Sequence, residues 1–115
     1  QSDSMYMLGL IYYQAHGVVQ NVDRAMQHFV DAANHGSAKG QFMASYLFLG
    51  GENHPNGDPE PVKAFIWAQV AKMNGYADAQ TLIDFSRLQL NDSVEGRAIE
   101  LAQNCYDSNY SQCPS

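Results

Sequence analysis

The chain has 115 residues, with 12 Asp and Glu against 6 Lys and Arg, and a formal net charge of −6 at pH 7 when its four histidines are neutral. Nonspecific binding to nucleic acid depends on Lys and Arg displacing counterions from phosphates, so this charge balance excludes a nucleic-acid partner. Hydrophobic residues make up 45% of the chain, and one domain of this length can bury a core from that share. We therefore expect a single globular domain over residues 1–115.

The longest nearly apolar run extends from Met5 to Tyr13. A helix that crosses a bilayer needs about 20 apolar residues, so we expect no membrane-spanning segment. The sequence starts at Gln1 without a basic stretch followed by an apolar one. We expect that any targeting signal lies upstream or has been removed.

Two blocks of sequence recur along the chain. Residues 4–12 resemble residues 40–48 at an offset of 36, and residues 24–38 resemble residues 63–77 at an offset of 39. The two offsets differ by three residues, which we place in the loop over 50–59. A third, degenerate copy follows from about residue 77 to 106. A period of this length is typical of repeat proteins that stack one supersecondary unit on the next.

Each copy has the hydrophobic spacing of two helices. In the first copy, apolar residues recur every three or four positions at Tyr6, Leu8, Ile11 and Tyr12, and again at Ala25, Phe29, Ala32 and Ala33. The sequence therefore predicts an all-α fold of about three helix pairs. We place the first repeat at about 2–37, the second at about 38–76, a degenerate capping repeat at about 77–106 and a tail at 107–115.

Polar residues and glycines mark the expected helix ends. Before the second helix of each pair we expect a side-chain cap, from Asn21, from Asp58, and from either Asn91 or Asp92. Pro59 would then lie in the first helical turn, where its missing N–H has no partner to lose. Gly36 and Gly75 are expected to end the second helices in a left-handed conformation.

The positions shared by the two clear copies resemble the Sel1-like repeat family, a relative of the tetratricopeptide repeat. In the first copy they are Leu8-Gly9, Tyr12, Ala15, Gly17-Val18, Asn21, Arg24-Ala25, Phe29, Ala32-Ala33, Gly36 and Ala38. The second copy keeps Gln41-Phe42, Phe48, Gly51, Lys63-Ala64, Trp67, Ala71, Gly75 and Ala77, and departs at Ala44-Ser45, where the family usually has Leu-Gly. The resemblance covers roughly residues 2–80 and implies a right-handed α/α solenoid.

In solenoids of this kind the first helix of each pair lines a concave groove, and the resemblance places its partner-binding positions in this chain. They are Tyr6, Leu10, Tyr13 and Gln14 in the first pair, Lys39, Phe42, Tyr46 and Leu49 in the second, and Thr81, Phe85 and Leu88 in the third. The aromatic members would either bind a partner or fill contacts between repeats. We expect Tyr6 and Phe42 to be core residues, and Tyr13 and Tyr46 to face the groove.

Cys105 and Cys113 are eight residues apart, which would separate them by about 12 Å in one continuous helix. A disulfide needs Cα atoms within about 7 Å, so if the two cysteines pair, the helix must end between them. Asp107-Ser108-Asn109 is a suitable terminator. We expect the disulfide; the alternative is two free thiols, with Cys105 packed like Ala32 and Ala71. A structural disulfide indicates an oxidising compartment, and the segment 99–113 resembles the closing segment of many bacterial proteins of the family. A periplasmic or secreted protein is therefore expected.

Candidate catalytic and metal-ligating residues do not form a recognisable set. The histidines His16, His28, His35 and His54 lack the partners of a zinc site, and we expect His28 to be a half-buried packing residue. The sequence contains neither a phosphate-binding loop nor a nucleophile elbow. We therefore expect a scaffold without catalytic activity, metal or cofactor that binds a partner protein or peptide. Two alternatives remain: a cell-wall-associated enzyme or small-ligand-binding protein, and the end of a longer solenoid.

Overall fold

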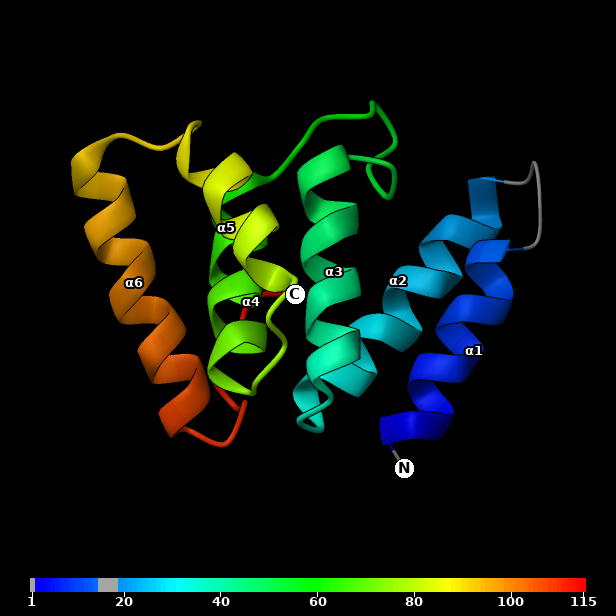
Figure 1. Cartoon of the computed structure of the whole chain (residues 1–115). Helices are drawn as coiled ribbons and strands as arrows, with labels where there is room; N and C mark the ends of the chain where they lie inside the picture. The colour runs from blue at the N-terminus through cyan, green and yellow to red at the C-terminus, as the bar shows by residue number, and fades with distance from the viewer. Residues whose placement is uncertain (1, 15–18) are drawn as a thin grey trace.

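The computed structural model describes residues 2–14 and 19–115, and these residues form six helices joined by turns and loops (Figure 1). The helices are α1 (Ser2–Gln14), α2 (Val19–Asn34), α3 (Ala38–Gly50), α4 (Pro61–Met73), α5 (Ala79–Arg87) and α6 (Asp92–Asp107). The described residues contain no strand. The expected all-α solenoid of helix pairs is therefore confirmed.

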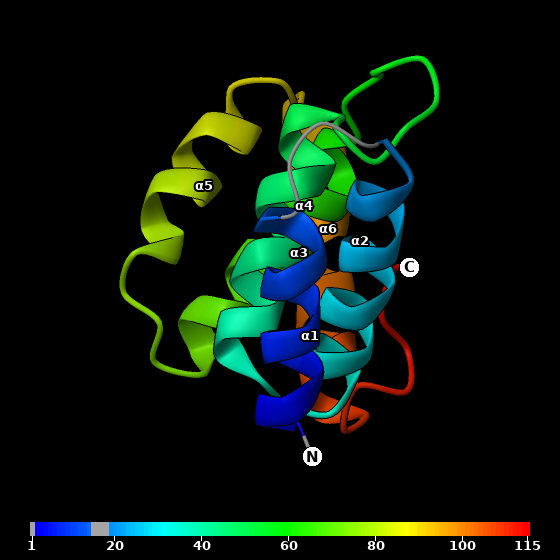
Figure 2. The ribbon, with the colours of Figure 1, turned by 90° about the vertical axis from the view of Figure 1, so that its right-hand side faces the viewer.

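The helix pairs stack in chain order. Helix α2 packs against both α1 and α3, and α4 packs against α3, α5 and α6. The first helices of the pairs are also neighbours, because α3 contacts α1 on one side and α5 on the other. Seen from the α1 end, α5 lies at one edge of the molecule, while α2 and the C terminus lie at the opposite edge (Figure 2). The stack thus has one side formed by the first helices α1, α3 and α5.

Small residues allow the helices to approach closely. A Cβ atom on Gly9 of α1 would lie 2.5 Å from the ring of Phe29 in α2, and one on Gly40 of α3 would lie 2.7 Å from the Cβ atom of Ala32. Phe29 and Ala32 are both fully buried. Because side chains larger than glycine would clash there, the spacing of α1, α2 and α3 follows from these two positions.

Three of the expected helix ends are confirmed. Gly36 and Gly75 follow α2 and α4 with φ of 90° each, a conformation that glycine adopts without steric cost. The side chain of Asn91 accepts a hydrogen bond of 2.8 Å from the backbone N–H of Val94, and so caps α6.

Two expected helix starts are wrong. Helix α2 begins at Val19, so Asn21 lies inside the helix and not before it. Helix α4 begins at Pro61 after Glu60, so Asp58 and Pro59 belong to the loop. The backbone N–H of Glu60 donates to the carbonyl of Phe48 at 2.8 Å, which holds the loop against α3 up to Glu60. The helix therefore starts two residues later than the local sequence indicates.

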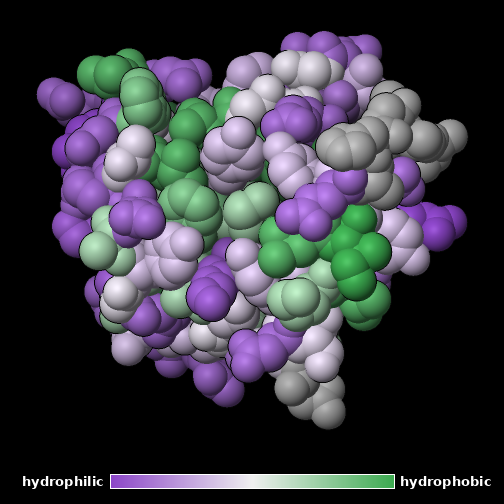
Figure 3. Space-filling model, turned by 45° about the vertical axis from the view of Figure 1, so that its right-hand side comes forward, coloured by the Kyte–Doolittle hydropathy of each residue, from purple (hydrophilic) through white to green (hydrophobic). Residues whose placement is uncertain are grey.

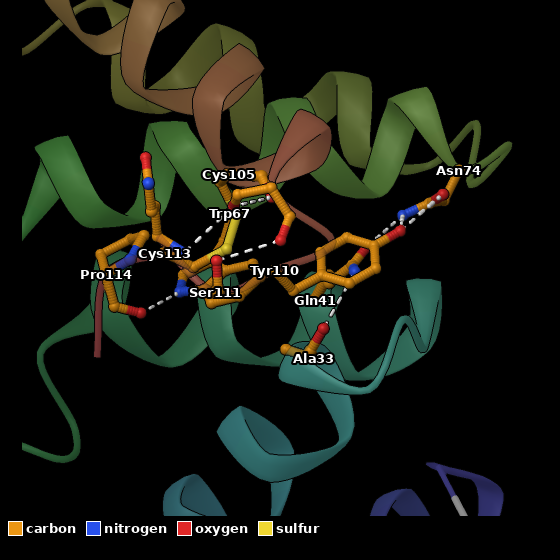
Figure 4. Close-up of a disulfide and its surroundings, with 11 residues drawn as sticks. Ala33, Gln41, Trp67, Asn74, Cys105, Tyr110, Ser111, Cys113 and Pro114 are labelled. Carbon is orange, nitrogen blue, oxygen red and sulfur yellow. Dashed lines mark hydrogen bonds between the residues drawn. A yellow bond between two sulfur atoms is a disulfide. The ribbon is translucent and has the colours of Figure 1, made fainter.

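The C-terminal tail turns back across the molecule after α6. Asn109 and Tyr110 have φ of 56° and 68°, so the helix ends where the sequence predicts a terminator. The turn brings Cys105 and Cys113 to disulfide distance, with Cα atoms 4.7 Å apart (Figure 4). Trp67 of α4 is fully buried, and its Nε1–H donates to the carbonyl of Pro114 at 2.9 Å. The tail therefore covers the largest buried side chain of the core.

A buried polar network joins the pairs beneath the tail. The side-chain amide of Gln41 donates to the carbonyl of Ala33 at 3.1 Å and accepts from Asn74 at 2.8 Å. Asn74 also donates to the hydroxyl of Tyr110 at 3.1 Å. Gln41 is fully buried, so these bonds satisfy an amide that would otherwise be costly to bury. They tie α2, α3, the end of α4 and the tail together (Figure 4).

Candidate partner-binding surface

The residues expected to bind a partner all lie on α1, α3 and α5 or at their ends, on the side that we call the α1–α3–α5 face. Six of them are exposed and five are half-buried. The exposed residues are Gln14, Lys39, Tyr46, Thr81, Phe85 and Leu88, and the half-buried ones are Tyr6, Leu10, Tyr13, Phe42 and Leu49.

One aromatic cluster lies between α1, α3 and the turn before α5. The ring of Tyr6 lies 5.8 Å from that of Phe29, and the Nζ atom of Lys39 lies 6.0 Å from the centre of the Tyr6 ring. Phe42 packs against Tyr76 with ring centres 4.9 Å apart. Burial, and then the nearby Tyr76, raise the pKa of the Tyr6 hydroxyl. Tyr6 and Phe42 thus contact neighbouring rings while remaining only half-buried.

A second cluster joins α1 to α3 toward the C-terminal ends of both helices. The hydroxyl of Tyr13 donates to Oε1 of Glu52 at 3.3 Å. Burial, the negative charge of Glu52 and the neighbouring Tyr46 raise the pKa of Tyr13 to about 12. Tyr13 therefore stays protonated and can donate a hydrogen bond at neutral pH. Tyr46 is 43% exposed, so its ring faces solvent beside this cluster.

Helix α5 presents large apolar side chains to solvent. Phe85 is 57% exposed and Leu88 is 82% exposed. Beside them, Arg87 forms ion pairs with Asp84 at 3.6 Å and with Glu95 of α6 at 3.4 Å. Figure 3 shows apolar side chains gathered on the α5 side of the surface. Such exposed apolar areas with polar surroundings mark contact surfaces.

Two residues of this face are absent from the set predicted from the sequence. Tyr76 follows Gly75 in the turn before α5, and Glu52 lies in the loop after α3. The repeat offsets carry positions only from helix to helix, so they give no position for a residue in a turn or an inserted loop. The signal for Glu52 would have been an acid beside the insertion, and for Tyr76 an aromatic directly after a helix-ending glycine.

In the part of the chain that the structure describes, the histidines and the acidic residues do not gather into a second site. His28 stacks on Tyr12 with ring centres 5.3 Å apart and is half-buried, as expected. His16 lies outside the described residues. Among residues 2–14 and 19–115, no group of three or more His, Cys, Asp or Glu side chains could hold a metal ion. Within the same ranges, no helix has the length and apolar character needed to cross a membrane.

A pocket of about 320 Å³ lies away from this face, on the side of α2 and the C terminus. It is lined by Met26, Gln27, Val30, Asp31, Phe48, Asn53, Glu60, Lys63 and Ser115. Its only described cation, Lys63, pairs with Glu60 at 3.0 Å and donates to the carbonyl of Ser115. The pocket shares no residue with the α1–α3–α5 face.

The chemistry of the α1–α3–α5 face is that of binding. It combines half-buried rings, exposed apolar side chains and a tyrosine hydroxyl beside a carboxylate. Aromatic side chains contribute much of the energy at protein interfaces, because a rigid ring buries a large area at little entropic cost.

Comparison with known proteins identifies the repeat. The sequence model described as the Sel1 repeat matches residues 2–37 and 38–76. No curated protein and no solved structure matches the chain. The two matched ranges correspond to the pairs α1–α2 and α3–α4 and make up more than half of the chain. The resemblance noted in the sequence is confirmed, and the chain belongs to the Sel1 repeat family.

Proposed function

We propose that this protein is a non-catalytic scaffold that binds a partner protein or peptide on its α1–α3–α5 face. Sel1 repeats are generally protein-interaction modules, which supports this role. The observation that carries the proposal is the exposure of Tyr46, Phe85 and Leu88 on one side of the stack. Side chains of this kind would be buried if they served only the core.

The contacts on this face suggest what it would recognise. Phe85 and Leu88 would bury an apolar side chain of the partner, because both expose most of their surface on one short helix. Tyr46 would pack on a neighbouring part of the partner, and Glu52 would accept from a backbone or side-chain donor. A segment that is apolar at one end and polar at the other fits this arrangement.

The two cysteines support an exported protein. Their Cα separation of 4.7 Å suits a disulfide, and disulfides persist in oxidising compartments such as the bacterial periplasm. We propose that binding takes place outside the cytoplasm, in the periplasm or the medium.

Site-specific photocrosslinking tests the proposed function. A benzoylphenylalanine in place of Tyr46 should crosslink to a discrete protein in the source organism. The matched control places the same group at Tyr106, a tyrosine of α6 that is 39% exposed and lies off the face. A product from position 46 that is missing from position 106 supports the proposal.

The opposite pattern would contradict it. Equal products from both positions would show nonspecific contact. Absence of any protein product, together with binding or hydrolysis of cell-wall fragments by the purified protein, would favour the alternative of a cell-wall-associated enzyme or small-ligand-binding protein.

A further inference from the structure

Helix α1 exposes an apolar surface that lies outside the contacts described so far. Met7, Leu8 and Ile11 are 54%, 43% and 59% exposed. Gly9 and Tyr12 of the same helix contact α2. We call the surface of the three exposed residues the outer α1 face. Figure 3 shows apolar surface on the α1 side of the molecule.

The internal repeat shows what covers the equivalent surface of α3. At the offset of 36 residues, Met7, Leu8 and Ile11 correspond to Met43, Ala44 and Leu47. Ala44 and Leu47 are fully buried, and Met43 is half-buried. Gly40 lies one turn before Ala44 on the same side, and a Cβ atom added there would lie 3.0 Å from the backbone nitrogen of Ala33 in α2. The second helix of the preceding pair therefore covers this side of α3.

Helix α5 repeats the arrangement. At the further offset of 39 residues, the same positions are Leu82, Ile83 and Ser86, which are 7%, 1% and 0% exposed. Helix α5 packs against α4, again the second helix of the preceding pair. In both α3 and α5, the second helix of the preceding pair therefore covers these positions.

We propose that the outer α1 face docks the second helix of another Sel1 helix pair, in the way that α2 docks on α3. The fit extends to the position at which α3 approaches α2 through Gly40. At the offset of 39 residues, α5 has Ala79, which is fully buried. The equivalent residue of α1 is Ser4, which is also small. The docking helix would present alanines at this point, as α2 presents Ala32 to Gly40. This surface shares no residue with the set assigned to the α1–α3–α5 face.

A second copy of the chain fits the outer α1 face less well. Its α2 and α4 already pack against α3 and α5. Its α6 carries Cys105 at the position of Ala32, and that cysteine holds the tail. The net charge of −6 on each copy also opposes close approach. The occupant is therefore a different helix pair of the family.

A tandem protein tests the proposal, with residues 2–37 repeated directly in front of Ser2 of the full chain. The added second helix should cover the outer α1 face of the original α1. Amide hydrogen exchange in that helix should then slow by about tenfold or more relative to the natural chain, because covered helices open less often.

Matched variants sharpen this experiment. Ile11→Glu should leave the thermal midpoint of the natural chain nearly unchanged, since Ile11 is 59% exposed, and should lower it clearly in the tandem protein. Ile99→Glu on α6, where the side chain is 46% exposed, should have the same small effect in both proteins.

Three results would overturn the proposal. The first is exchange in the original α1 that stays as fast as in the natural chain, with Ile11→Glu equally tolerated in both proteins. The second is an added pair that remains unfolded by circular dichroism while the rest folds. The third is sedimentation that shows a dimer of the natural chain which Ile11→Glu abolishes, because this would assign the face to a second copy.

Discussion

At Gly40, helices α2 and α3 come so close that a Cβ atom would lie 2.7 Å from Cβ of Ala32 and 3.0 Å from the backbone nitrogen of Ala33. The backbone nitrogen cannot move without shifting α2. We expect Gly40→Ala to lower the free energy of unfolding by about 1–3 kcal/mol, the usual cost of overpacking. Urea unfolding followed by circular dichroism measures this change.

Gly96 provides the matched control, because it also lies within a helix, α6, but a Cβ atom added there would meet no described neighbour within 4 Å. Gly96→Ala should raise the free energy of unfolding by about 0.5–1 kcal/mol, since alanine favours the helix over glycine. Equal effects of the two substitutions would show that α2 and α3 are not held together at Gly40.

Residues on helices could be predicted from the sequence better than residues in loops. From the repeat offsets we expected Tyr6 and Phe42 to fill contacts between repeats and Tyr46 to face the groove. The first two are half-buried beside neighbouring rings, and Tyr46 is 43% exposed. Tyr76 and Glu52 join these clusters only through the paths of a turn and a loop, which depend on contacts distant in sequence.

At the scale of elements, the helix ends that depend on local residues could be predicted, and those that depend on distant contacts could not. The ends at Gly36, Gly75 and Asn91 were predictable because the residue at each end acts on its own turn. The start of α4 was not, because a hydrogen bond from Glu60 to the carbonyl of Phe48 in α3 decides where the loop stops. The residues around Asp58 therefore could not predict that hydrogen bond.

The tail is the element whose stability the cysteines should control. Removing the link with Cys113→Ser should lower the free energy of unfolding by about 2–3 kcal/mol, from the added freedom of a short loop in the unfolded chain. The tail carbonyl of Pro114 would also be released from Trp67. We expect the tryptophan emission to move to longer wavelength, measured by fluorescence.

Reduced wild-type protein serves as the control for this variant and should behave in the same way. Two reactive thiols in the denatured, unreduced protein would contradict the disulfide. So would a Cys113→Ser variant with unchanged stability and unchanged emission.

At the scale of the whole molecule, stacked helix pairs account for the low share of charged residues, 16% of the chain. Many positions serve contacts between neighbours, where Ala25, Ala32, Ala64 and Ala71 are fully buried. The sequence predicted this architecture because the spacing of small and apolar residues recurs with the repeat. The sequence could not identify the partner, because exposed rings indicate the chemistry of a contact and not which protein makes it.

The affinity of a double variant for the partner crosslinked at position 46 tests the binding role of the α1–α3–α5 face most directly. Tyr46→Ala combined with Phe85→Ala removes two exposed rings, 43% and 57% accessible, so the thermal midpoint should stay nearly unchanged. Hot-spot residues contribute about 2 kcal/mol or more, so we expect calorimetry to show a Kd raised by about 30-fold or more. An unchanged Kd in the folded variant would contradict a binding role for this face.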